Sequence, residues 1–307
     1  MGATGITAQA TPEPESEKAI LIISDQDGER KLYTVRTDGS GPQLFLDLTA
    51  YGRLISAALS PDGSKLAFVA FQDEDLFNLL YVLEISTEAA TQVRVGLTDI
   101  ADLTWTPDSS HLIYMADGVN EDFNNIYQYD PRTGMEQKLD WRGSLYQAVK
   151  FDFIGNMEQS PDGQKFVFDL HTLPPEAYVF FAVINADGTD AYQLPLTRPS
   201  YRPFAWNDQS DTIYFQCVSE TTSEVNEICS MDLATQQTQI AISQKQIPEM
   251  TENGIREISI DHNRLAINFL LGSAIYVVDL QTGDITRLLE AEAYEISMIG
   301  WIDIKDK

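Results

Sequence analysis

The chain of 307 residues carries 47 acidic and 20 basic residues, a formal net charge of −27, and 43% of its residues are hydrophobic. This acidic surplus repels nucleic-acid phosphates and anionic lipid surfaces, so we expect no nucleic-acid partner. No apolar run approaches the roughly 18 residues that a membrane-spanning helix needs, which predicts a soluble globular protein without a membrane span.

Residues 1–18 differ in composition from the rest and combine small residues with a Pro/Glu/Ser stretch. Such a segment is typical of a flexible leader or linker, which places the folded domain at 19–307. Ala8-Gln9-Ala10 fits the small-x-small pattern of a signal-peptidase site, but no charged or sufficiently apolar region precedes it. A trimmed exported protein and a plain disordered tail both fit this segment.

A β-hairpin signal then recurs along the chain. Residues 58–70 read ALSPDGSKLAFVA, a Pro-Asp-Gly turn followed by an apolar strand. Aligned with Ser60-Pro61-Asp62-Gly63, the further turns are Thr106-Pro107-Asp108-Ser109, Ser160-Pro161-Asp162-Gly163, Asn207-Asp208-Gln209-Ser210 and Ser259-Ile260-Asp261-His262.

A second strand follows each hairpin and occurs six times. Its equivalent positions recur every 46 to 55 residues, at Tyr33, Tyr81, Tyr127, Ala182, Cys229 and Tyr276. Units of this length with about four short strands each are typical of a β-propeller.

The two ends of the chain complete each other. The first strand pair, 19–23 and 32–35, has no hairpin turn before it, whereas 294–303 reads as an inner strand without a continuation. We therefore predict an all-β fold, a six-bladed β-propeller of four-stranded blades, whose ring is closed when the C-terminal strand joins the N-terminal blade.

At residues 24–45, SDQDGERKLYTVRTDGSGPQLF, followed by the hairpin at 58–70, the sequence resembles the TolB-type six-bladed propellers with their WD-like repeats. The resemblance covers nearly all of 19–303 and implies the propeller fold. It says little about function, because such blades also occur in propeller domains of prolyl-oligopeptidase-type peptidases and in many bacterial envelope proteins. The α/β domain that precedes the TolB propeller has no counterpart here.

The cysteines lie on two successive predicted strands. A polar loop between Cys217 and Cys229 would fold these strands against each other, so the thiols could face one another and form a disulfide. Two buried free thiols are the alternative.

Catalytic and metal-binding motifs are missing from the sequence. It contains no G-x-S-x-G pentapeptide, and His111, His171 and His262 lie at turns or strand ends without ligand spacing. The acidic loops 24–29, 72–78 and 117–125 lack the twelve-residue calcium-loop pattern. We expect no cofactor, no metal site and no enzymatic activity.

A propeller ligand is expected on the funnel face, where the loops enter the innermost strands. Those loops are rich in arginine and aromatic residues, which suit a partner bearing carboxylates. The candidate binding residues are Arg53, Trp141, Arg142, Tyr201, Arg202 and Arg256. The alternative is that these residues serve local ion pairs and packing between blades.

Two functional classes fit the sequence. The first is a non-catalytic protein- or peptide-binding propeller of the bacterial cell envelope or extracellular space, a monomer or a subunit of an envelope complex. Any lipid anchor would lie upstream of the sequence. The second is a glycan-active hydrolase or lyase, or a carbohydrate-binding protein, on the same scaffold. We favour the binding protein, because no convergent ligand set or carboxylate pair is evident from the spacing.

Overall fold

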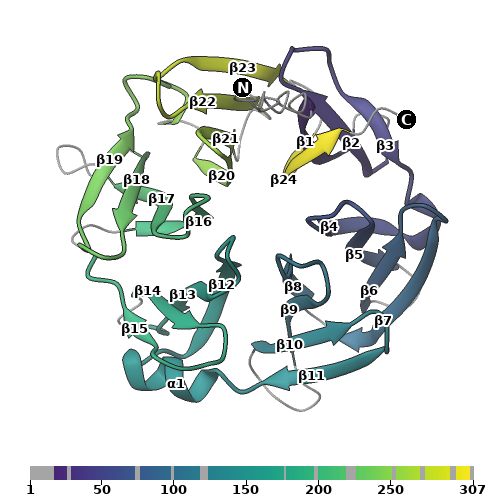
Figure 1. Cartoon of the computed structure of the whole chain (residues 1–307), viewed down its shortest axis with the longest axis horizontal. Coiled ribbons are helices and arrows are strands. Elements are labelled where there is room, and N and C mark those ends of the chain that lie inside the picture. Colours follow the sequence, from purple (N-terminus) through teal and green to yellow (C-terminus); the bar gives the residue numbers. More distant parts are fainter. Residues whose placement is uncertain are drawn as a thin grey trace, which may run out of the picture.

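A computed structural model describes residues 17–25, 29–72, 77–97, 100–117, 124–175, 178–196, 200–218, 226–250, 254–269, 274–290 and 295–304. The expected leader, 1–18, lies outside this set except for Glu17 and Lys18. Six four-stranded antiparallel sheets stand in a ring as the blades of a propeller, with their inner strands toward the centre (Figure 1), which confirms the predicted fold class.

The first three blades follow one another around the ring, each written from the channel outward. Blade 1 contains β24 (Ile296–Ile304), β1 (Glu17–Ser24), β2 (Lys31–Arg36) and β3 (Gln43–Leu46). Blade 2 contains β4 (Arg53–Leu59), β5 (Lys65–Gln72), β6 (Phe77–Glu84) and β7 (Ala89–Leu97), and the 3-10 helix η1 (Thr49–Tyr51) precedes it. Blade 3 contains β8 (Ile100–Trp105), β9 (Leu112–Asp117), β10 (Asn124–Asp130) and β11 (Met135–Leu139).

The other three blades repeat this order. Blade 4 contains β12 (Phe153–Gln159), β13 (Lys165–His171), β14 (Val179–Asn185) and β15 (Tyr192–Gln193), preceded by the helix α1 (Arg142–Ala148). Blade 5 contains β16 (Ser200–Trp206), β17 (Thr212–Val218), β18 (Asn226–Asp232) and β19 (Thr238–Ile242). Blade 6 contains β20 (Ile255–Asp261), β21 (Arg264–Phe269), β22 (Ala274–Asp279) and β23 (Ile285–Glu290).

The ring is closed by the two ends of the chain. β24 pairs antiparallel with β1, with Ile20 opposite Trp301 and Ser24 opposite Ile296, and the two strands lie side by side in Figure 1. The predicted closure is thus confirmed. Because β24 completes blade 1, the channel-side edge of β1 is paired rather than left open.

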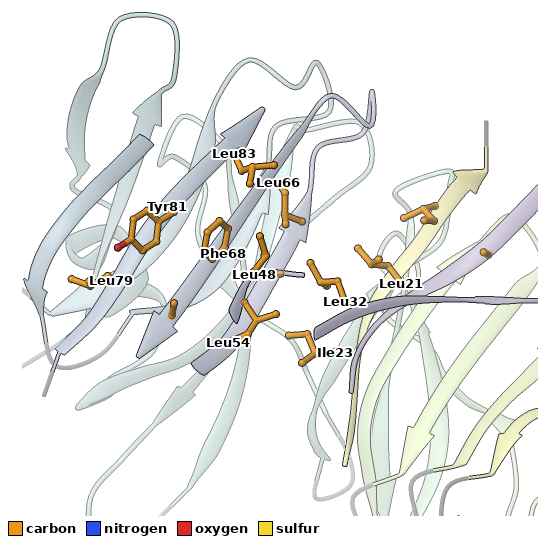
Figure 2. Close-up of a cluster of buried hydrophobic side chains, with 14 residues drawn as sticks. Leu21, Ile23, Leu32, Leu48, Leu54, Leu66, Phe68, Leu79, Tyr81 and Leu83 are labelled. Atoms are coloured by element: carbon orange, nitrogen blue, oxygen red, sulfur yellow. The ribbon is translucent and has the colours of Figure 1, made fainter. Parts of the chain in front are cut away.

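The hydrophobic core is divided among the six junctions between neighbouring blades. On β5, Leu66 and Phe68 pack toward blade 1, with Leu32 and Leu54 in the same cluster (Figure 2). The alternate residues Ala67 and Val69 pack toward blade 3. Both faces of a middle strand are therefore buried, which explains why the sequence KLAFVA is apolar without the usual alternation.

The hairpin turns after the inner strands follow the sequence alignment in blades 2 to 5. In blade 2, Leu59 pairs with Leu66, so six residues separate the two partners. In blade 6, Ile260 pairs with Leu265, so the hairpin of blade 6 is two residues shorter. Its turn is Asp261–Arg264 and not the expected 259–262. The aligned sequence misplaced it because this tight turn, with His262 at φ 56°, has neither Pro nor Gly to mark it.

Tryptophans on three inner strands tie each of these strands to the preceding blade. Trp105 Nε1 donates to Ala58 O at 3.0 Å, Trp206 Nε1 to Glu158 O at 3.3 Å, and Trp301 Nε1 to Ser259 O at 3.2 Å. The donors belong to blades 3, 5 and 1 and the acceptors to blades 2, 4 and 6, so this contact alternates around the ring.

In blade 5, Cys217 and Cys229, expected to face each other from neighbouring strands, form a disulfide with a Cα–Cα distance of 5.8 Å. Both residues are fully buried in the cluster between blades 4 and 5. The bond therefore joins β17 to β18 inside the core.

Candidate functional site

Irregular pairing of the inner strands determines which side chains face the channel mouth. The pairing of each inner strand with its neighbour shifts register once, for example between Leu54 and Ser56 in blade 2 and between Ile255 and Glu257 in blade 6. Such a bulge leaves one residue out of the ladder and redirects its side chain. In blade 6 the residue left out is Arg256.

Arg53 begins β4 and is placed by the residue before it. Gly52 has φ 108°, and a Cβ atom there would lie 2.4 Å from Phe71 O, so only glycine allows this approach. The side chain of Arg53 is exposed. It lines a cavity on this face of the ring.

Two further arginines approach Arg53 from blades 1 and 6. Arg30, in the loop between β1 and β2, donates to Ser297 Oγ at 3.4 Å, and Arg256 pairs with Glu257 through Nε at 3.3 Å. Burial and the positive charges of Arg53 and Arg256 lower the pKa of Arg30, although Glu295 and Asp25 act in the opposite direction. Arg30 stays charged at neutral pH nevertheless, because the pKa of arginine starts far above 7.

A cavity of about 540 Å³ opens beside Arg30 and Arg53 on the funnel face. It is lined by Asp25, Glu29, Arg30, Thr49, Gly52, Arg53 and Glu295. We call Arg30, Arg53 and Arg256 the arginine cluster. Asp25 is engaged at the cavity edge, where its Oδ1 accepts the Glu295 N–H at 2.7 Å, and Glu29 pairs with Lys31 at 3.3 Å. Two of the lining carboxylates thus have partners of their own.

Glu257 connects the arginine cluster to the ring. Its Oε2 accepts hydrogen bonds from Asn268 Nδ2 and, at 3.0 Å, from the Met298 N–H of blade 1. Burial raises the pKa of Glu257, although these hydrogen bonds and the charges of Arg256 and Arg30 oppose the rise. Because Glu257 bridges blades 6 and 1, it fixes Arg256 with respect to Arg30.

Of the other expected site residues, Trp141 and Arg142 lie away from the cluster. Trp141 is 5% exposed and packs on Phe166, and Arg142 donates to Asp152 O at 2.7 Å. The helix that begins at Arg142, α1, contacts β14 and β15 at the outer rim of blade 4 (Figure 1). The sequence-based placement differs because 139–154 passes around the outside of this blade before β12.

Tyr201 and Arg202 lie on β16, and their side chains are outside the described part of the chain. Sequence analysis missed Arg30, because only loops entering inner strands were considered. The loop between β1 and β2 opens on the same face, and the neighbouring acidic residues of 24–29 gave the only signal. The structure therefore brings together Arg53 and Arg256 from the expected set and adds Arg30.

Polar groups of blades 3 and 4 lie across the ring from the cluster. Asp169 is 1% exposed and accepts from Asn156 Nδ2 at 3.1 Å and lies 3.1 Å from His171 Nε2, so this histidine has a structural partner. Glu158 is exposed on β12, and burial of its carboxyl group among neighbouring atoms, followed by the charge of Asp102, raises the pKa of this group. Solvent access to Glu158 opposes that rise.

The class of protein defined by these features is a six-bladed β-propeller with an arginine-bearing cavity on its funnel face. The sequence matches no protein-family model and no curated protein, so the comparison rests on solved structures. The chain is similar to TolB from Acinetobacter baumannii, with a TM-score of 0.68 and 16% identity over 93% of this chain. It spans 66% of that TolB chain.

Two other solved structures share the fold. A chain of a nidogen/laminin complex superposes with a TM-score of 0.64 and 8% identity, over 92% of this chain and 97% of the other. The tricorn protease gives 0.51 and 12%, and this chain, matched over 93%, spans 32% of it. At these identities the likeness defines a TolB-like propeller fold. None of the helices in the described ranges is long and apolar enough to cross a membrane.

Proposed function

We propose that the protein is a non-catalytic propeller that binds a protein or peptide partner through its funnel face, in the periplasm or outside the cell. The observation that carries this proposal is the arginine cluster. Three guanidinium groups from blades 1, 2 and 6 repel one another, and an oxyanion placed among them relieves that repulsion while accepting several hydrogen bonds. A carboxylate is the group that a peptide partner offers.

The fold and the disulfide support this proposal. One chain with a similar propeller belongs to a nidogen/laminin complex, which is an assembly of proteins. Disulfides such as Cys217–Cys229 form and persist in oxidising compartments, which agrees with a location outside the cytoplasm. The acidic body does not oppose a local arginine site, because charge is screened over about 8–10 Å at physiological salt.

The test uses an array of decapeptides, each made once with a free C-terminal carboxylate and once as the amide, probed with the full chain. We expect the acid forms to bind more tightly and their binding to fall with added salt. Arg53→Gln and Arg30→Gln should each weaken the best peptide about tenfold, which corresponds to about 1.4 kcal/mol, a charge-assisted hydrogen bond.

Arg132→Gln is the matched control, since Arg132 is a 70% exposed arginine whose ion pair, within the described ranges, is with the carboxylate of Asp130 in its own turn. The funnel-face site would be contradicted if acid and amide peptides bound equally well. It would also be contradicted if Arg132→Gln weakened binding as much as Arg53→Gln. Circular dichroism of each variant checks that the ring is intact.

A glycan-active enzyme is the second candidate, and the observation that favours it is the approach of two carboxyl groups: Asp102 Oδ2 accepts the N–H of Met157, the residue before Glu158, at 3.1 Å. Glycosidases use two carboxyl groups, one of them held protonated as a general acid. Hydrolysis of a panel of polysaccharides that is lost in Glu158→Gln would support this candidate over the binding protein.

A further inference from the structure

The hairpin turns on the face opposite the funnel, here called the lower face, connect neighbouring blades through polar contacts. Ser109 Oγ of blade 3 accepts the Asp62 N–H of blade 2 at 3.0 Å. Ser210 Oγ of blade 5 accepts the Asp162 N–H of blade 4 at 3.0 Å. The same turn position thus reaches back to the preceding blade in both pairs.

The next junctions are closed in other ways. Between blades 3 and 4, Pro107 packs on Gly163, where an added Cβ would lie 3.0 Å from the proline ring. Between blades 5 and 6, the His262 N–H donates to Asp208 Oδ1 at 3.2 Å. Between blades 6 and 1, Lys18 Nζ lies 3.2 Å from Asp261 Oδ1. Five of the six junctions therefore have a described contact on this face.

The junction between blades 1 and 2 is different because blade 1 has no hairpin turn. Its two inner strands, β24 and β1, come from opposite ends of the chain and are not connected. Gly63 is the counterpart of Gly163, yet a Cβ atom built on it meets none of the described residues within 4 Å. Within the described ranges, no turn of blade 1 packs on Gly63 as Pro107 packs on Gly163.

A cavity of about 840 Å³ occupies this place. Its apolar lining includes Leu44, Phe45, Leu59, Pro61 and Ile85, and Gly63 lies at its edge with them. Leu44 is 57% exposed, one of the few large hydrophobic side chains left in water among the described residues. The cavity is separate from the arginine cluster, since it opens on the other face of the ring.

We propose that this cavity binds a turn of the type Ser/Thr-Pro-Asp/Glu that is presented by a partner protein and takes the place of the turn missing from blade 1. The repeats of this chain show what fits between two blades at that position, because Pro107 packs on Gly163 in the equivalent junction. The proline of the bound turn lies on Gly63, and its flanking side chains cover Leu44.

The chemistry of such a turn favours binding. In this chain Thr106 Oγ1 donates to Asp108 Oδ1 at 2.6 Å, and Ser160 Oγ to Asp162 Oδ1 at 2.6 Å. These bonds hold the turn in shape before any contact with a neighbour, and proline fixes φ at its second position. A preformed turn loses little conformational entropy when it binds.

The probe is a backbone-cyclised peptide that contains Thr-Pro-Asp-Ser, titrated into the full chain and followed by calorimetry. We expect saturable binding at one site, weakened on the order of tenfold when the proline is replaced by alanine. Leu44→Asp should weaken binding by a similar factor, because it places a charge against the apolar side of the peptide.

Ile240→Asp is the matched control, since Ile240 is a 44% exposed side chain on β19, the outer strand of blade 5. Absence of saturable binding, or an equal loss in both variants, would overturn the proposal. Thr11-Pro12-Glu13 repeats the pattern outside the described residues. If the peptide bound only after removal of residues 1–16, the cavity would belong to the chain's own N-terminal segment. That result would also overturn the proposal of a partner protein.

Discussion

Single aspartates determine the shape of the hairpin turns on the lower face. In the third blade, Asp108 Oδ1 accepts from Thr106 Oγ1 at 2.6 Å and from Ser110 Oγ at 2.7 Å. Hydrogen bonds from Thr106 and then Ser110 lower the pKa of Asp108 to about 2. The carboxylate is thus stabilised in the folded chain relative to the unfolded one.

Asp108→Asn should lower stability at neutral pH, and the loss should be clearly smaller at pH 2.5. A pKa that is lower in the folded state stabilises the fold at pH values above the unfolded-state pKa of about 3.9. This contribution is lost as the pH falls from about 4 to 2. Since the group is exposed, the loss at pH 6 should not exceed about 1 kcal/mol. Urea unfolding at pH 6 and pH 2.5 measures it, with the exposed Asp140→Asn as control. A difference that persists unchanged at pH 2.5 would contradict the assignment.

At the scale of the strand, the sequence predicted the elements whose two faces are buried. KLAFVA and its equivalents were recognisable because burial between two blades requires apolar residues at every position. The placement of the segment 139–154 could not be predicted. The sequence places Trp141 in a loop, where an aromatic residue suggests a binding site, but Trp141 packs on Phe166 of blade 4. Arg53 and Arg256 were found by their position before an inner strand, whereas Arg30 belongs to a different type of loop.

The disulfide between β17 and β18 gives a prediction for this element. It closes a loop with a sequence separation of 12, for which the chain-entropy model gives about 3 kcal/mol of stabilisation. Reduction should therefore lower the urea midpoint of the native chain and leave that of a Cys217→Ala/Cys229→Ala chain unchanged. Equal midpoints with and without reductant in the native chain would show that the bond contributes no stability.

On the scale of the whole molecule, the ring depends on one strand that has no covalent link to the blade it completes. β24 pairs with β1 along its length, and Ile296 and Met298 belong to the cluster between blades 6 and 1. The position of Trp301 after an apolar strand indicated this closure in the sequence. The lower-face cavity was not foreseeable, because it depends on the pairing of β24 with β1, two strands that no hairpin turn connects.

Deletion of residues 296–304 should open the ring. The deletion uncovers the edge of β1 and the apolar side chains of two blades, which should cost several kcal/mol of stability. In a chain of this size, such a loss lowers the melting temperature by about 10 °C or more. Scanning calorimetry measures this, and dye binding reports the uncovered core. Removal of residues 1–15 controls for chain shortening. Melting at the native temperature after the C-terminal deletion would contradict closure by β24.

The alternating tryptophans divide the six junctions of the ring into two kinds. Trp105, Trp206 and Trp301 are about 100 residues apart, twice the length of a blade, and each donates to the blade before it. The junctions between blades 2 and 3, 4 and 5, and 6 and 1 therefore carry an indole hydrogen bond that is not described at the other three. By this contact the ring consists of three pairs of blades, and the two ends of the chain meet inside one of these pairs.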